Sequence, residues 1–165
     1  MKRQAAFLAL YNSGYPLYRD YTNLSKVPNP EEKIPTILMI NRWDGKIGFP
    51  GGHVDPGESP LEALKRELLE EINYEVRKEP TFVCRIEAPN TILHFYAQEI
   101  PDFKELKSIV RQSLAARHYG SEVTGVFLQH LKTYKDDKGL ATFLQGSNLV
   151  YGVKQEIEDL LALMK

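Results

Sequence analysis

The sequence is poor in the features that are typical of secreted proteins, membrane-spanning proteins and proteins that bind polyanions. Its one cysteine, Cys84, cannot form an internal disulfide. No apolar run approaches the roughly 18 residues that a membrane helix needs, so we expect no membrane partner. The formal net charge is −1, without the strong basic excess typical of polyanion binders, so a phosphate-bearing ligand would need a local cluster or a metal ion. We expect a cytoplasmic protein, or a nuclear one in a eukaryote.

The length of 165 residues is enough for one compact domain, residues 1–165, with a sizeable core. Apolar periodicity predicts strands near residues 4–11, 34–41, 74–77, 81–87, 91–99 and 122–131, and helices near 60–72, 103–117 and 152–164. The stretch 12–33 is rich in Asn, Pro, Tyr and Lys and is expected to be a long loop or a hairpin, whereas 47–58 is rich in Gly and Pro and is expected to be a loop. This order of elements predicts a mixed α/β fold with helices flanking a sheet.

The helix expected at residues 60–72 has clear start and stop signals. Ser59 is a good N-cap and Glu62 completes a Ser-x-x-Glu capping box. Pro60 suits the first helical position. Asn73 can take the left-handed conformation that usually falls to glycine after a helix. We therefore expect the helix to begin at residue 60 and end near residue 72.

Three glutamates on this helix indicate a cation site. Glu67, Glu70 and Glu71 lie at i, i+3 and i+4, where like charges destabilise an isolated helix. A hard divalent cation such as Mg²⁺ or Mn²⁺ would offset that repulsion. A Glu-rich helix is more often only a solvated face. What favours a site here is the preceding Gly51-Gly52 loop, where the backbone can approach closely and a carbonyl can join the metal shell.

The same residues resemble the signature of a known family, the Nudix hydrolases. The pattern is Gly52-x5-Glu58-x7-Arg66-Glu67-Leu68-x-Glu70-Glu71-x-Asn73-Tyr74. It matches the Nudix box at every catalytic position and departs from it at Asn73, where the family has glycine. The resemblance implies an α/β/α sandwich around a mixed sheet. It also implies hydrolysis of a phosphoanhydride bond in a nucleoside-diphosphate-linked substrate by metal-activated water.

The resemblance also assigns roles to individual residues. Glu67, Glu70 and Glu71 are the expected catalytic residues and metal ligands, and the Gly51 carbonyl is a further expected ligand. Residues Glu58 and Arg66 are expected to orient the helix and its carboxylates. The expected cofactor is Mg²⁺ or Mn²⁺.

Three looser motifs are similar to one branch of that family, the snoRNA-decapping and inosine-diphosphatase enzymes. They are Arg42-x-Asp44-Gly45-x-x-Gly48-Phe49-Pro50-Gly51-Gly52, His118-Tyr119-Gly120-x-Glu122-Val123 and Gly139-Leu140-x-Thr142-Phe143-Leu144. This likeness implies capped RNA or inosine and guanosine diphosphates as substrates. It adds Glu122 as a distant metal ligand, and Phe7, Arg42 and His53 as substrate-binding residues. The alternatives are a core position for Phe7, a loop histidine at 53 and a solvated acid at 122.

Two other functions stay open at this point. One is a housecleaning Nudix hydrolase that acts on ADP-ribose or nucleotide sugars. The other is a Nudix module that senses a nucleotide without cleaving it, although the intact Glu67, Glu70 and Glu71 set speaks against it. The apolar strands and the C-terminal helix allow a homodimer, which the sequence does not decide.

Overall fold

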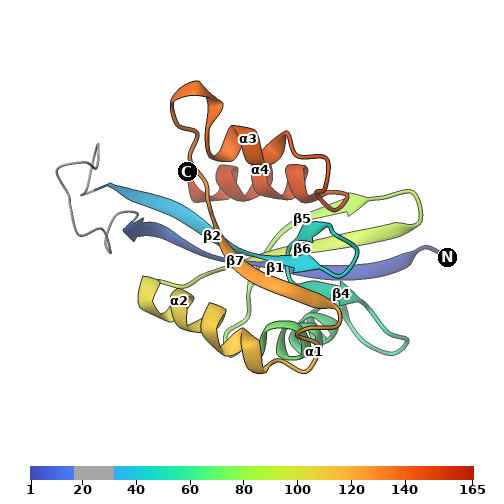
Figure 1. The fold of residues 1–165 in the computed structure, drawn as a ribbon. Helices are drawn as coiled ribbons and strands as arrows, with labels where there is room; N and C mark the ends of the chain where they lie inside the picture. The colour runs from blue at the N-terminus through green and yellow to red at the C-terminus, as the bar shows by residue number, and fades with distance from the viewer. Residues whose placement is uncertain (17–31) are drawn as a thin grey trace.

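The computed structural model describes residues 1–16 and 32–165, and Figure 1 shows their arrangement. The strands are β1 (Arg3–Pro16), β2 (Lys33–Arg42), β3 (Ile47–Gly48), β4 (Gly51–His53), β5 (Thr81–Glu87), β6 (Thr91–Glu99) and β7 (Val123–His130). The helices are α1 (Pro60–Ile72), α2 (Phe103–Gln112), α3 (Leu140–Leu144) and α4 (Val153–Met164), with short 3-10 turns at Ser113–Ala115 and Lys135–Asp137. In the described residues these strands form one seven-stranded sheet.

The sheet is mixed and has β1 near its middle. Along the order β3-β2-β1-β6-β5, β1 pairs in parallel with β6 and antiparallel with β2, while β4 also pairs with β1 and β7 with β2. Helices α1 and α2 cover one face of the sheet, and α3 and α4 cover the other (Figure 1). The predicted mixed α/β sandwich is therefore confirmed.

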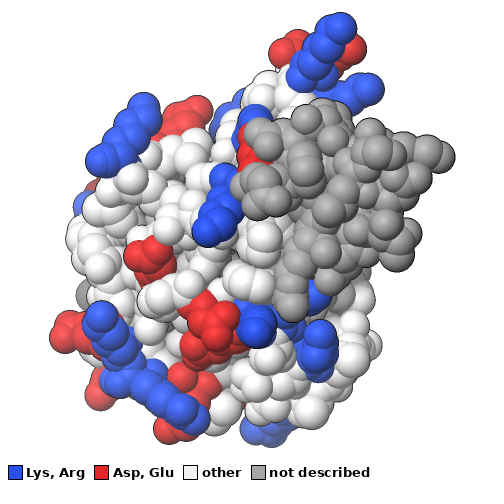
Figure 2. Space-filling model, turned by 90° about the vertical axis from the view of Figure 1, so that its left-hand side faces the viewer, with Lys and Arg blue, Asp and Glu red and all other residues white. Residues whose placement is uncertain are grey.

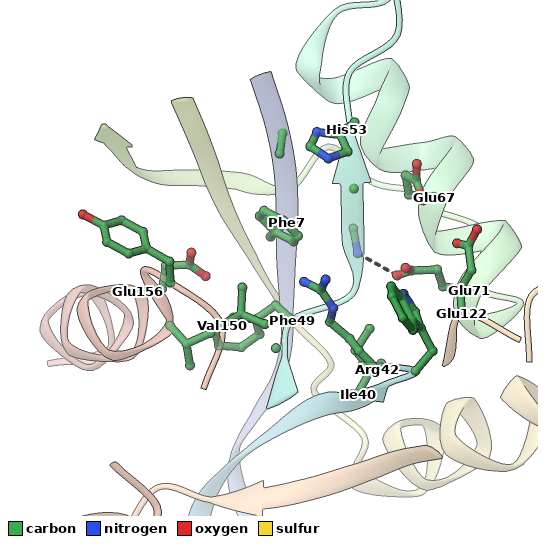
Figure 3. Close-up of a pocket in the computed structure, with 17 residues that line it drawn as sticks. Phe7, Ile40, Arg42, Phe49, His53, Glu67, Glu71, Glu122, Val150 and Glu156 are labelled. Atoms are coloured by element: carbon green, nitrogen blue, oxygen red, sulfur yellow. Dashed lines mark hydrogen bonds between the residues drawn. The ribbon is translucent and has the colours of Figure 1, made fainter. Parts of the chain in front are cut away.

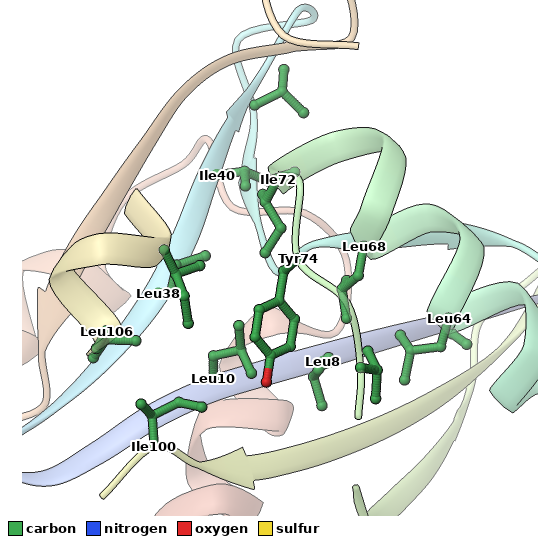
Figure 4. Packing of buried hydrophobic residues seen from close by; sticks show 14 residues of the cluster. Leu8, Leu10, Leu38, Ile40, Leu64, Leu68, Ile72, Tyr74, Ile100 and Leu106 are labelled. Atoms are coloured by element: carbon green, nitrogen blue, oxygen red, sulfur yellow. The ribbon is translucent and has the colours of Figure 1, made fainter. Parts of the chain in front are cut away.

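Each face of the sheet has its own apolar core. Because successive side chains of a strand point to opposite faces, β1 supplies Leu8 and Leu10 to one core and Ala9 to the other. Figure 4 shows the first core, where the strand residues meet the apolar face of α1. Its side chains Leu64, Leu68 and Ile72 are all fully buried. Burial of each stabilises the fold by roughly 1.5–3 kcal/mol, which fixes the rotation of α1 about its own axis.

Residues 12–33 were predicted as a long loop or a hairpin, and the structure shows strand pairing at both of their described ends. β1 continues to Pro16 and β2 already begins at Lys33, because the two strands extend their pairing from Tyr11 opposite Ile37 to Pro16 opposite Lys33, with an irregularity between. Residues 17–31 of that predicted loop lie outside the described residues.

Two further predictions of secondary structure differ from the structure, and one helix was missed. Residues 74–77 form no strand, because Tyr74 and Val76 turn into the core as an irregular connection without a partner strand. The helix predicted at 103–117 ends at Gln112 and continues as a 3-10 turn. The short helix α3 was not predicted at all. Apolar alternation reports which side chains are buried, and it does not report which backbone has a pairing partner.

Candidate active site

A cavity of about 290 Å³ opens where β4, α1, the end of β2 and the start of α4 meet. It is lined by Ala5, Phe7, Ile40, Arg42, Trp43, Gly48, Phe49, Gly51, Gly52, His53, Glu67, Glu71, Glu122, Val150, Tyr151, Val153 and Glu156. Figure 3 shows its two ends: Glu67, Glu71 and Glu122 lie on one side and Glu156 on the other, with Phe7 and Phe49 between them. One end is therefore acidic, and the rest is largely aromatic and aliphatic.

Helix α1 presents its carboxylates from a well-defined start. The Ser59 side chain accepts a hydrogen bond from the Glu62 backbone N–H, and the Ser59 N–H donates to the Glu62 carboxylate at 2.7 Å. The helix ends at Asn73, which has φ 55° and ψ 36° in the left-handed region. Both predicted caps are confirmed. Since both ends and the apolar face are fixed, the acidic face of α1 has one orientation relative to the sheet.

Glu71 is the buried carboxyl of the acidic end. Its residue is 7% exposed, and one carboxylate oxygen accepts a hydrogen bond from the Gly51 backbone N–H at 2.9 Å. Burial raises the pKa of Glu71 to about 8, and the nearby charges of Glu67 and Glu122 act in the same direction, whereas the Gly51 hydrogen bond opposes them. The charge of Arg42 also opposes this increase, and a cation bound beside the carboxyl would favour its ionised form further.

The two glycines before α1 bring the backbone against that carboxyl. Gly51 has φ 143°, and a Cβ there would collide with the backbone of Ala6 and Phe7. At Gly52 a Cβ would lie 2.5 Å from the carboxylate carbon of Glu67. Both positions therefore have no room for a side chain, and β4 passes directly beneath the acidic face of α1. The expected loop at 47–58 thus contains the short paired strand that positions the site.

The planar guanidinium of Arg66 binds two neighbouring carboxylates. Its guanidinium donates to both carboxylate oxygens of Glu58, at 2.7 and 3.0 Å, and to Glu67 at 2.8 Å. It also donates to the His53 carbonyl at 3.1 Å. This two-pronged hydrogen bond lowers the pKa of Glu58 to about 2. Glu58 and Arg66 thus tie the loop to α1.

Glu70 and Glu122 lie on either side of His118. The His118 Nδ1 atom lies 3.2 Å from a carboxylate oxygen of Glu122 and 3.8 Å from one of Glu70. Nδ1 is buried and makes no hydrogen bond within residues 1–16 and 32–165, so the 3.2 Å approach is a close contact without hydrogen-bond geometry. His118 has no role in the sequence-based prediction, although its spacing of four residues from Glu122 is visible in the sequence. Glu122 immediately precedes β7 and lines the cavity, whereas Glu70 does not.

The acidic end has the donor chemistry of a magnesium or manganese site. Its donors are carboxylate oxygens, which hard divalent cations prefer. In residues 1–16 and 32–165 no three His, Cys, Asp or Glu side chains are grouped closely enough to hold an ion. Arg66 draws Glu67 aside, and like charges repel. The side chains of Glu67, Glu70 and Glu122 are 13%, 22% and 57% exposed, so they have room to turn towards a cation.

The three predicted substrate-binding residues all line the cavity. Phe7 is half-buried in the middle of it, and His53 is exposed at the end of β4. Arg42, at the end of β2, donates to Asp44 at 2.9 Å and keeps its side chain 35% exposed. The structure thus places Phe7, Arg42 and His53 in one cavity with Glu67 and Glu71. Their contact with a substrate stays a prediction.

The C-terminal segment contributes a wall of the cavity that was not predicted from the sequence. Val150, Val153 and Glu156 line the cavity, as does Phe49, which packs on Phe95 with ring centroids 4.9 Å apart. A visible signal for Glu156 was its place next to Ile157 on the apolar face of α4. Glu156 is 2% exposed. Burial raises its pKa to about 8, and the charge of Asp159 adds to the effect.

Comparison with solved structures identifies the fold as that of the Nudix class. A MutT/Nudix family protein from Listeria innocua superposes with a TM-score of 0.60 over 98% of this chain and 93% of its own, at 16% identity. The Nudt16-like family model, described as U8 snoRNA-decapping enzyme-like, matches residues 19–164. The chain therefore belongs to the Nudt16-like branch of the Nudix hydrolase family, and the predicted family and branch are confirmed.

Several curated relatives carry the name U8 snoRNA-decapping enzyme, among them those of an insect and the mouse. The one from Homalodisca vitripennis is 44% identical over 66% of this chain and 61% of its own length. The mouse enzyme is 33% identical over 81% of this chain and 75% of its own length. The alignment thus spans less than two thirds of the first relative. The family is typically dependent on divalent metals, which agrees with the carboxylate oxygens at the acidic end.

Proposed function

We propose that this protein hydrolyses a phosphoanhydride bond in a nucleoside-diphosphate-linked substrate, either capped RNA or an inosine or guanosine diphosphate type of nucleotide. The observation that carries this proposal is the cavity itself, which joins an acidic end at Glu67, Glu71 and Glu122 to an aromatic middle at Phe7 and Phe49. Such a cavity fits a ligand with phosphates at one end and a base at the other. The curated relatives named as decapping enzymes support the same substrate class.

The residues at and near the acidic end of the cavity would have different roles in this reaction. Glu67, Glu70, Glu71 and Glu122, with the Gly51 carbonyl, would hold Mg²⁺ or Mn²⁺. When bound, such an ion activates water and neutralises charge on the phosphates. Arg42 lines the cavity beside the acidic end and can bind a phosphate oxygen. Arg66 and Glu58 hold α1 against the loop and so keep the carboxylates in register.

The test is product release from a panel of substrates. The panel contains inosine and guanosine diphosphates, ADP-ribose, NAD and a short capped RNA, each with Mg²⁺ and with Mn²⁺. Glu71→Gln is the inactive variant. Glu75→Gln is a matched control, because it removes the same charge from an exposed position outside the cavity. We expect inosine or guanosine diphosphate or capped RNA to be the best substrate, and Glu71→Gln alone to abolish turnover.

The other outcomes separate the alternatives. A preference for ADP-ribose or a nucleotide sugar would retain the hydrolase and reject the substrate class. Tight binding of a nucleotide without turnover would replace the enzyme with a sensing module. The homodimer and the cytoplasmic or nuclear location stay predictions. Among the described residues, no helix combines the length and the apolar character needed to cross a membrane.

A further inference from the structure

The end of the cavity opposite the acidic site contains a carboxyl group that the proposed chemistry does not use. Glu156 lies in the first turn of α4 and is 2% exposed. Its side chain has no hydrogen-bond or ion-pair partner in residues 1–16 and 32–165, and the only neighbouring charge that affects it is that of Asp159, of the same sign. A carboxyl buried without a partner costs free energy in the folded state. The fold nevertheless keeps it in the cavity wall.

The surroundings of Glu156 leave space beside its carboxyl group. That space is the cavity itself, which Glu156 lines. On the Gly152 side the packing is tight, because a Cβ added there would lie 2.9 Å from the Leu93 Cδ1 atom and 3.2 Å from the Glu156 Oε1 atom. The neighbouring walls are apolar, with Val150 and Val153 from the C-terminal segment and Phe49 from the β3–β4 connection. Figure 3 shows Glu156 beside Val150, on the side away from Glu67 and Glu71. A planar ligand between the aromatic residues would therefore meet one acceptor group at its far edge.

We propose that the Glu156 carboxylate recognises guanine, by accepting hydrogen bonds from the N1–H and the 2-amino group on one edge of the base. The inference rests on the proposed function, since it takes a nucleotide to occupy the cavity with its phosphates towards Glu67 and Glu71. Two donors side by side match the two oxygens of a carboxylate, as the fork of an arginine does. They also favour the ionised form of the carboxyl, which the protein alone does not stabilise.

Hydrogen bonding of the base to Glu156 predicts an order of affinity among the purines. Hypoxanthine has the N1–H but no 2-amino group, so it leaves one oxygen of Glu156 unsatisfied. Adenine presents an acceptor at N1, which opposes a carboxylate. A site built to bind a donor rejects the analogue that lacks it, because its own buried group is then left unpaired. The expected order is guanine, then hypoxanthine, then adenine.

The experiment compares binding of GMP, IMP and AMP to the wild-type protein and to Glu156→Gln by titration calorimetry with Mg²⁺. Hydrolysis of GDP and IDP is measured in parallel. We expect wild type to bind GMP about tenfold more tightly than IMP, the gain typical of one added charge-assisted hydrogen bond. Glu156→Gln should bind the two equally, since its amide presents only one acceptor. Glu158→Gln removes the same charge from the exposed face of α4 and should keep the preference.

The outcomes distinguish this inference from the proposed function. Equal binding of GMP and IMP by wild type overturns the guanine assignment, even if both diphosphates are hydrolysed. A preference that survives in Glu156→Gln, or that Glu158→Gln also removes, overturns the role of Glu156. If GMP is preferred through Glu156 but nothing is hydrolysed, the proposed function fails and the inference stands. A thermal melt of each variant verifies that it is folded.

Discussion

Two buried glutamates lie at opposite ends of one cavity, and their surroundings differ. Glu71 accepts a hydrogen bond from the Gly51 N–H at 2.9 Å and has Glu67 and Glu122 as charged neighbours in the cavity. Glu156 has no hydrogen-bond partner among the described residues, and only Asp159 affects its charge. Burial raises the pKa of both to about 8. The same increase in pKa thus occurs in two different surroundings. Glu71 belongs to a group of acids that together suit a cation, whereas Glu156 is a single acid that suits a hydrogen-bond donor.

The largest expected effect separates the two carboxyls by their part in turnover. Glu71→Gln keeps the shape and the Gly51 contact but removes the negative charge from the acidic end, so kcat should fall by about a hundredfold or more. Glu156→Gln should retain kcat to within a few-fold for inosine diphosphate. Steady-state kinetics with Mg²⁺ measure both. Equal losses in the two variants would mean that the ends of the cavity do not have separate tasks.

The second prediction concerns stability and pH, for Glu156 alone. Its pKa is about 8 in the folded protein, against 4.5 as its ordinary value. A folded-state pKa above the unfolded one stabilises the fold at pH below 4.5, and this contribution is lost as pH rises from 4.5 to about 8. The free energy of unfolding of wild type should therefore fall by about 3 kcal/mol relative to that of Glu156→Gln between pH 5 and pH 8. Denaturant unfolding at both values measures this difference, and parallel curves for the two proteins would contradict it.

The third prediction tests how closely β4 passes beneath α1. Gly52→Ala places a methyl group against the Glu67 carboxylate, whereas it requires no unusual φ at residue 52. The carboxylate must shift by a few tenths of an ångström or more, so kcat should fall about tenfold while the melting temperature changes little. Gly14→Ala in β1 is the matched control, because residue 14 also needs no positive φ and a Cβ there makes only an ordinary contact with Lys33, at 3.6 Å. A loss of activity in the control alone would refute the close-approach argument.

The sequence predicted helix α1 and its caps well because those features are local. The capping signals at Ser59, Pro60 and Asn73 define α1, and the spacing of Glu67, Glu70 and Glu71 follows from the helical repeat. These features depend on neighbours within one turn. The likeness to a known family then supplied the fold around them.

The opposite end of the cavity could not be predicted, because it depends on distant pairing. Glu156 reaches the cavity only because α4 packs on the face of the sheet opposite α1, and nothing near residue 156 reports that contact. The same holds for the extension of β1 to Pro16, which requires the matching residues of β2. Helical periodicity indicated which side of α4 is buried, but not which partner it is buried against.

The smallest expected effect concerns His118, which lies between Glu70 and Glu122. Its Nδ1 approaches Glu122 to 3.2 Å, and its backbone N–H donates to the Glu70 carbonyl at 2.9 Å. His118→Gln keeps the backbone contact and removes the ring. The half-exposed Glu122 side chain should therefore adopt more conformations that point away from the cavity. We expect His118→Gln to bind Mn²⁺ about threefold more weakly than wild type. Residues that orient metal ligands usually have a tenfold or greater effect. The effect should be smaller here because Glu122 is only one of several donors.

Electron paramagnetic resonance of free Mn²⁺ measures this affinity without turnover. The matched control is His130→Gln at the far end of β7, outside the cavity. A change in kcat with unaltered Mn²⁺ affinity would place His118 in contact with substrate instead. Equal affinity and equal kcat in both variants would mean that Glu122 is held by its backbone alone, whose carbonyl accepts from the Trp43 N–H at 3.0 Å. The position of the acidic end would then depend on the β2–β7 pairing and not on the histidine between its acids.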